Sequence, residues 1–365
     1  MSRVKRFAFD DGFNGDVHGV AWPASLEYLI FEGDCNQSVQ MVVWPVSLQV
    51  LIFFGGVTSF AGVSWPPSLR SLMLFSSVPN ESIAGATWPV SLKLLYLGRG
   101  FNQPIDTVAW PPSLKKLHLG SDFIQPIAGV KWPASLQQLS LDGNFRHLAG
   151  DITWPASLQQ LTLGSVFNQP ITGATWPPLL QQLTFGYKFN QSIAGVTWPP
   201  SLQQLTFGDR FDQPIAKATW PPSLQRLRFN VKFNQPLADV SWPDSLQEIT
   251  FSGDVEMHSW LHDGKLFVGE REMLSNFNQP ITEVRWPASL LKVTFGDFFD
   301  QPIDGVAWPA SLRELAFGRD FRLPKKSFEW PASFQQLTIA RRPNELLPSW
   351  PGVRVIGIWR AYWNS

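Results

Sequence analysis

The chain has 365 residues, of which 44% are hydrophobic and 16% are charged, and its 29 basic and 29 acidic side chains cancel. This composition excludes a disordered polyelectrolyte, and the zero net charge argues against general attraction of the molecule to nucleic acid. A single cysteine excludes an internal disulfide framework and multi-cysteine metal sites. The high content of proline (31 residues) and tryptophan (18 residues) indicates a repeated motif.

The N-terminal segment, residues 1–10, carries three basic residues but lacks the apolar stretch of a secretion signal. No run of residues approaches the ~18 consecutive apolar residues that a membrane-spanning helix needs. From these features and the single cysteine we expect no membrane span, and we favour a cytoplasmic location.

A Trp-Pro dipeptide recurs 15 times along the chain, mostly at intervals of 22 residues. The unit 198–219, WPPSLQQLTFGDRFDQPIAKAT, is representative. Its L-x-x-L-x-F spacing, over Leu202, Leu205 and Phe207, is the strand signature of leucine-rich repeats. Alternation within the strand predicts that Leu205 points into the core and that Gln204 and Thr206 point outward. We expect the proline-rich remainder of each unit to return the chain without a helix, because proline disfavours helical geometry at the residue before it.

These residues resemble the FNIP repeat, a variant of the leucine-rich repeat in which F-N-x-P-I and P-x-S-L-x-x-L-x-[FL]-G stretches recur. The resemblance spans residues 4–355, with Trp-Pro where the family usually has Leu-Pro. It implies an all-β repeat solenoid, a leucine-rich-repeat-like right-handed coil of about 16 stacked units. One parallel β-sheet lies on one face of this coil, and irregular proline-rich returns lie on the other.

We expect a single elongated solenoid over residues 1–365. Its predicted parts are an N-terminal partial repeat or cap (1–21), regular repeats (22–251), a degenerate repeat (252–275), regular repeats (276–349) and a C-terminal cap (350–365). The degenerate stretch is interpreted either as a coil that carries a hairpin around Asp263 and Gly264 or as a plain variant coil.

The repeats lack the convergent, nonrepeated polar groups that an enzyme needs, and no nucleotide-binding motif is present. We therefore predict a non-enzymatic recognition or scaffold protein with no catalytic residues, no cofactor and no metal site. One alternative is a structural repeat protein without a single partner. Another is ice or glycan binding by glutamine and threonine ladders, formed by Gln160, Thr162, Gln182, Thr184, Gln204 and Thr206.

Departures from the consensus on the outward face of the strands identify candidate binding residues. In the first coils these positions are apolar: Tyr28, Ile30, Val50, Ile52, Phe54, Met73, Phe75, Leu94 and Tyr96. We predict that another protein, or a second copy of this chain, binds this N-terminal sheet face. A secondary basic patch comprises Lys188, Arg210, Arg226, Arg228 and Lys232, for which a solvated surface is the favoured interpretation.

Overall fold

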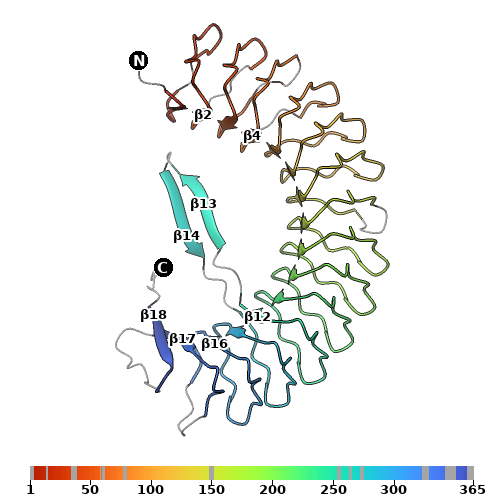
Figure 1. Cartoon of the computed structure of the whole chain (residues 1–365), viewed down its shortest axis with the longest axis vertical. Helices are drawn as coiled ribbons and strands as arrows, with labels where there is room; N and C mark the ends of the chain where they lie inside the picture. The colour runs from red at the N-terminus through yellow and green to blue at the C-terminus, as the bar shows by residue number, and fades with distance from the viewer. Residues whose placement is uncertain are drawn as a thin grey trace. The chain divides into compact units, whose positions relative to one another are not determined.

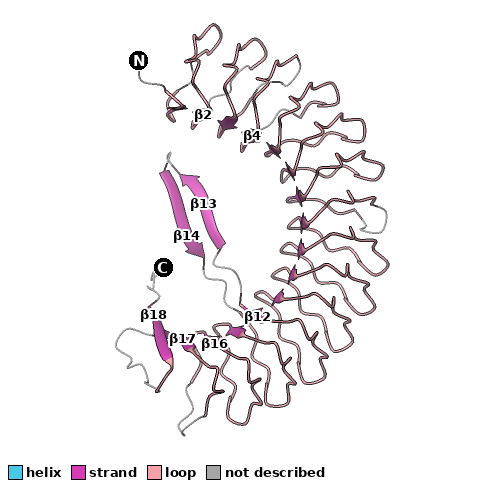
Figure 2. Ribbon diagram, viewed as in Figure 1, coloured by secondary structure: helices cyan, strands magenta, loops and turns pink. Residues whose placement is uncertain are grey.

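A computed structural model of the chain shows strands that follow one another in chain order, each in its own coil (Figure 1). Figure 2 shows turns and loops between the strands, and no helix occurs in the part of the chain that is described. The structure describes residues 4–13, 15–33, 39–57, 59, 62–76, 80–147, 152–252, 256–262, 265–271, 275–322, 329–341 and 351–359. Within these ranges there is no helix long and apolar enough to cross a membrane.

The chain divides into two compact units. The first comprises Met1–Phe167, Thr175–Leu180 and Leu261–Lys265, and the second comprises Asn168–Ala174, Gln181–Trp260 and Leu266–Ser365. Strands of the first unit are β1 (Arg6–Phe9), β2 (Tyr28–Phe31), β3 (Val50–Phe53), β4 (Ser71–Leu74), β5 (Leu94–Leu97), β6 (Lys116–Leu119), β7 (Gln138–Leu141) and β8 (Gln160–Leu163). Strands of the second unit are β9 (Gln182–Thr184), β10 (Gln204–Thr206), β11 (Arg226–Arg228), β12 (Glu248–Phe251), β15 (Lys292–Phe295), β16 (Glu314–Phe317), β17 (Gln336–Arg341) and β18 (Arg354–Trp359).

Successive strands within each unit pair in parallel, with equivalent residues of neighbouring repeats side by side. In the second unit, for example, Leu205 lies in register with Leu183 and Leu227. Leu205 and Phe207 are buried, whereas Gln204 and Thr206 are half-buried. The predicted inward and outward faces and the parallel sheet are therefore confirmed.

Two tight turns in each repeat explain the fixed proline and glycine positions. After Trp198, the Leu202 N–H donates to the Pro199 carbonyl over 3.1 Å, which closes a turn with a second proline at its first central position. Before the tryptophan, the Val196 N–H donates to the Ile193 carbonyl over 3.3 Å. Gly195 sits in that turn with φ of 73°, a conformation that other residues adopt only with strain. The return segments are thus irregular, as the sequence predicted.

Aromatic rings form ladders through the core and along the tryptophan edge. In the second unit, the Phe207 and Phe229 ring centroids lie 5.4 Å apart with near-parallel planes. Along the edge, the Trp22–Trp44 and Trp220–Trp242 centroids are 6.2 Å and 5.9 Å apart. These centroid distances suit offset aromatic packing between neighbouring coils.

A serine ladder joins many neighbouring coils in both units. The hydroxyl of the serine in W-P-x-S-L donates to a leucine carbonyl one coil back, as in Ser157 to Leu136 and Ser245 to Leu224, at 2.7 Å and 2.8 Å. Such bonds satisfy carbonyl groups beside the turn, each with a net contribution of about 1 kcal/mol. In the coil that begins at Trp176, Leu179 occupies the serine position and is 53% exposed.

An asparagine ladder runs along the opposite, F-N-Q-P-I side of the coils. Each asparagine side-chain oxygen accepts the backbone N–H of the equivalent residue in the next coil. The distance is 3.0 Å from Asn102 to Asn80 and 2.8 Å from Asn190 to Asn168. The neighbouring glutamine donates to the same oxygen, as Gln191 does to Asn168 over 3.2 Å. The repeated Asn-Gln pair is therefore structural.

The stretch 252–275 carries two paired strands, as the hairpin interpretation predicted, but it does not form a coil of its own. β12 pairs directly with β15, so this stretch adds no strand between them. The Phe251 and Phe277 rings stack at 4.2 Å, the same relation that Phe207 and Phe211 have at 4.1 Å. The interval is therefore one coil with a 22-residue insertion in the turn after the strand. The inserted strands β13 (Glu256–His262) and β14 (Lys265–Arg271) form a separate two-stranded sheet, while residues 263–264 lie outside the described residues.

Candidate functional site

The predicted N-terminal residues lie in two rows on the outward face of β2 to β5. One row pairs Tyr28 with Val50, and its continuation reaches Leu94 across Ser71. The other row runs in register through Ile30, Ile52, Met73 and Tyr96. These side chains are half-buried, which is the accessibility expected of residues that line a sheet surface.

Aromatic side chains extend these rows past the ends of the strands. Phe54 stacks on Phe75 at 5.0 Å, Phe75 contacts Tyr96 at 4.8 Å, and Tyr96 contacts His118 at 5.1 Å. Phe75 is 38% exposed. At the N-terminal end of the two rows, the Arg6 guanidinium lies 5.0 Å from the Tyr28 ring centroid, a cation–π arrangement. We name Phe54, Phe75, Tyr96 and His118 the aromatic run.

Burial perturbs the two titratable members of the aromatic run in opposite directions. It raises the pKa of the Tyr96 phenol, and Asp142 adds to the rise while Arg99 opposes it. Burial lowers the pKa of the His118 imidazole, an effect that Asp142 opposes and Lys116 strengthens. Both shifts favour the uncharged forms of the two side chains.

The structure divides the predicted basic patch into two groups. Arg226 and Arg228 lie on the outward face of β11, with the Arg226 Nε 3.5 Å from a Glu248 carboxylate oxygen. Burial lowers the pKa of Arg228, and Glu248 opposes this shift. They line a cavity of about 260 Å³ together with Gln204, Thr206, Glu248 and Thr250. The other group, formed by Lys188, Arg210 and Lys232, is exposed at one turn position in successive coils.

The glutamine and threonine rows also lie on the outward face. Gln182 and Thr184 pair with Gln204 and Thr206, and Gln160 and Thr162 occupy the same positions of β8. The side chains are half-buried and repeat without variation. These rows provide no distinct feature on which a specific ligand would select.

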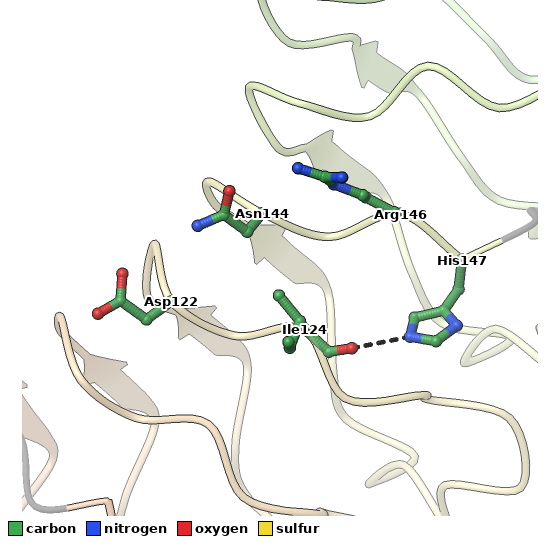
Figure 3. A pocket seen from close by; sticks show the side chains of 5 residues that line it. All are labelled: Asp122, Ile124, Asn144, Arg146 and His147. Atoms are coloured by element: carbon green, nitrogen blue, oxygen red, sulfur yellow. Dashed lines mark hydrogen bonds between the residues drawn. The ribbon is translucent and has the colours of Figure 1, made fainter.

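A second candidate site, which sequence reasoning missed, lies in the turns that follow β6 and β7. Asp122, Ile124, Asn144, Arg146 and His147 line a cavity of about 540 Å³ (Figure 3). Figure 3 shows the Arg146 side chain directed toward Asn144, with Ile124 below them and Asp122 on the far side. Ile124 and Arg146 stand where other coils have the ladder asparagine, and His147 stands where they have glutamine.

His147 replaces the ladder glutamine in function as well as in position. Its Nε2 lies 2.9 Å from the Ile124 carbonyl oxygen, so it donates to that oxygen as Gln125 donates to the Asn102 carbonyl. The sequence signal for this cavity was the loss of asparagine in two consecutive coils, at Ile124 and Arg146. Loss of the asparagine in a single coil would resemble ordinary sequence variation, but its loss in two adjacent coils interrupts the ladder.

Comparison with protein families agrees with this repeat geometry. The model of the FNIP Repeat matches residues 79–122, 101–144, 189–232 and 211–254. The chain contains FNIP repeats. The matched ranges contain part of both ladders, such as Asn80, Asn102 and Asn190. The cavity lined by Asp122 and Arg146, called the edge cavity below, lies within and beside the second match. No curated protein sequence matches the chain.

Solved structures similar to this FNIP-repeat chain are leucine-rich-repeat proteins. CroV588, reported as a novel circular LRR protein structure, has 28% identity and a TM-score of 0.55 over 91% of this chain and 56% of CroV588. The chain thus spans little more than half the length of that protein. An internalin, InlF from Listeria monocytogenes, has a TM-score of 0.52 at 15% identity over 86% of each chain and supports the fold alone. Leucine-rich-repeat solenoids commonly bind other proteins along an extended face.

Proposed function

We propose that this FNIP-repeat protein is a non-enzymatic recognition protein that binds another protein through the outward face of β2 to β5. The observation that carries the proposal is the apolar surface itself. Four consecutive strands carry Ile30, Ile52, Met73 and Tyr96 at the position where Thr162, Thr184 and Thr206 stand in later coils. Soluble proteins seldom expose more than a few hundred Å² of contiguous apolar area unless it is an interface.

The aromatic run supplies the anchors of this surface. Phe54 stacks on Phe75 at 5.0 Å, and Phe75 contacts Tyr96 at 4.8 Å with tilted rings, so binding orders few additional rotamers. Rigid aromatic side chains carry much of the binding energy at protein interfaces, often 2 kcal/mol or more for each anchor. Because β-branched and aromatic neighbours already fix these rings, the free surface is pre-organised for a partner.

The experiment removes the apolar character while leaving the core intact. We expect Ile52→Ser combined with Tyr96→Ser to change the free energy of unfolding little, because both side chains lie on the outward face. Partner recovery by the wild type and by the double variant is compared by quantitative affinity purification from the source cells. Self-association is measured in parallel by light scattering of the purified chain.

A matched control carries Gln160→Ser and Thr162→Ser, which occupy the same two rows on β8. The proposal predicts that the control keeps the partner that the double variant loses. Undiminished binding by the double variant contradicts it, as does unfolding of that variant, since the side chains would then belong to the core. Loss of self-association without loss of any other protein would identify the partner as a second copy of the chain.

A further inference from the structure

The cavity beside β6 and β7 contains polar donors that the repeat normally satisfies. In regular coils the backbone N–H at the asparagine position donates to the asparagine oxygen of the coil before, as Ile124 still does to Asn102 over 3.0 Å. Arg146 has no such acceptor, because Ile124 precedes it in the ladder. Within the described part of the chain, neither the Arg146 backbone N–H nor its guanidinium has a hydrogen-bond or ion-pair partner.

The other lining residues limit what these donors can bind. Asp122 is partly occupied, since its carboxylate accepts from the Gly100 N–H over 3.1 Å and from the Ser121 hydroxyl over 3.2 Å. Asn144 donates to the Ser121 carbonyl over 3.1 Å, which fixes its amide at the rim. Ile124 is 50% exposed and provides an apolar wall. A guanidinium and a carboxylate therefore face one cavity across an apolar side chain, without pairing with each other.

We propose that this cavity binds a carboxylate group of a polypeptide, with Arg146 as the recognition residue. The planar guanidinium donates two parallel hydrogen bonds to a carboxylate, and such charge-assisted bonds are roughly twice as strong as neutral ones. Asp122 repels a dianionic phosphate group more strongly than a singly charged carboxylate, and it can accept a backbone N–H next to the bound carboxylate. Ile124 then contacts an apolar neighbour in the peptide. A volume of about 540 Å³ is within the range of small-ligand cavities.

This inference rests on the proposed function only in taking a polypeptide as the ligand, and its test uses no natural partner. The probes are three synthetic peptides: acetyl-Gly-Leu-Asp-Leu-Gly-amide, its Asn counterpart, and that counterpart with a free C-terminal carboxylate. Binding to the full chain is measured by saturation-transfer difference NMR and calorimetric titration. We expect the dissociation constant of at least one carboxylate peptide to be about tenfold lower than that of the fully blocked Asn peptide. The peptide that gains affinity distinguishes an acidic side chain from a chain terminus.

Restoring the repeat consensus provides the decisive variants. Arg146→Asn removes the guanidinium, and Ile124→Asn returns an acceptor for the Arg146 N–H, so each uses the residue that regular coils carry. We expect Arg146→Asn to abolish the preference for carboxylate without loss of thermal stability, and Ile124→Asn to weaken it. Lys131→Asn, which removes an exposed positive charge outside the cavity, should leave it unchanged.

Several results would overturn the inference: equal binding of all three peptides, a preference that survives Arg146→Asn, or an equal loss in Lys131→Asn. Tighter binding of a phosphoserine peptide than of the Asp peptide would also contradict it. The sheet-face double variant, Ile52→Ser with Tyr96→Ser, keeps the cavity and should bind the carboxylate peptide normally. Failure of the sheet-face proposal and failure of this one are thereby separated.

Discussion

Leu205→Ala tests the assignment of inward and outward faces in the regular coils. Leu205 is 1% exposed and lies between Leu183 and Leu227 of the neighbouring strands. Backbone hydrogen bonds hold both strands in place, so the cavity left by the truncated side chain collapses little. We therefore expect a cost in the upper half of the range for buried leucines, about 3 to 5 kcal/mol. Urea denaturation followed by tryptophan fluorescence gives the free energy of unfolding by linear extrapolation.

The matched control is Thr206→Ala in the same strand, where the side chain is half-buried on the outward face. We expect its effect to stay within about 0.5 kcal/mol. Equal losses of stability in Leu205→Ala and Thr206→Ala would refute the reasoning, because side chains alternate between faces and a one-residue slip exchanges them all. A changed denaturant slope in either variant would show that unfolding has lost cooperativity, and the comparison would then use hydrogen exchange of the strand amides.

Three further predictions concern the irregular positions of the stack. Leu179→Ser restores the serine ladder toward the Leu158 carbonyl and should raise the free energy of unfolding by about 0.5 to 1.5 kcal/mol, measured in urea; a loss would show that this carbonyl is inaccessible. Deleting 253–274 should return the turn after β12 to regular length and leave a cooperatively folded chain by circular dichroism, whereas non-cooperative unfolding would contradict the insertion. Because burial lowers the pKa of His118, its contribution to stability is present above about pH 6.5 and is lost as the pH falls through the lower folded-state pKa. We expect His118→Thr to reduce the loss of unfolding free energy at low pH, measured by urea titrations at several pH values. An unchanged dependence of the unfolding free energy on pH would contradict the prediction.

The regular part of the fold could be predicted because one pattern is repeated many times. A strand of two inward residues, such as Leu205 and Phe207, can bury them only against identical neighbours, so the period itself sets the parallel register. The insertion could not be predicted in this way, since its 22 residues equal one period and keep the tryptophans in phase. The stretch does place Gly264 and Arg271 where a coil needs a tryptophan and a leucine. Those two residues were the physical sign that no core layer forms there.

The two candidate sites differ in how far the sequence could predict them. The apolar rows were visible because outward positions are known once the strand alternation is known. The edge cavity depends on hydrogen bonds between coils, and a sequence does not show that Asn102 accepts the Ile124 N–H. Because regular coils make that bond, the isoleucine at position 124 leaves the Arg146 N–H without its usual acceptor. In a side-chain ladder, a substitution in one coil therefore changes the hydrogen bonding of the equivalent residue in the next coil.

Both candidate sites lie in the first unit. His118 ends the aromatic run on β6, and Asp122 begins the lining of the edge cavity four residues later in the same coil. A polypeptide that packs an apolar segment on Tyr96 and continues along β6 passes from the sheet surface to the turn that carries Asp122. If both proposals hold, the sheet face contributes apolar contact area, and Arg146 contributes a directional, charge-dependent contact. Apolar area alone discriminates poorly between partners, whereas the proposed contact with Arg146 depends on the charge and the direction of the ligand group.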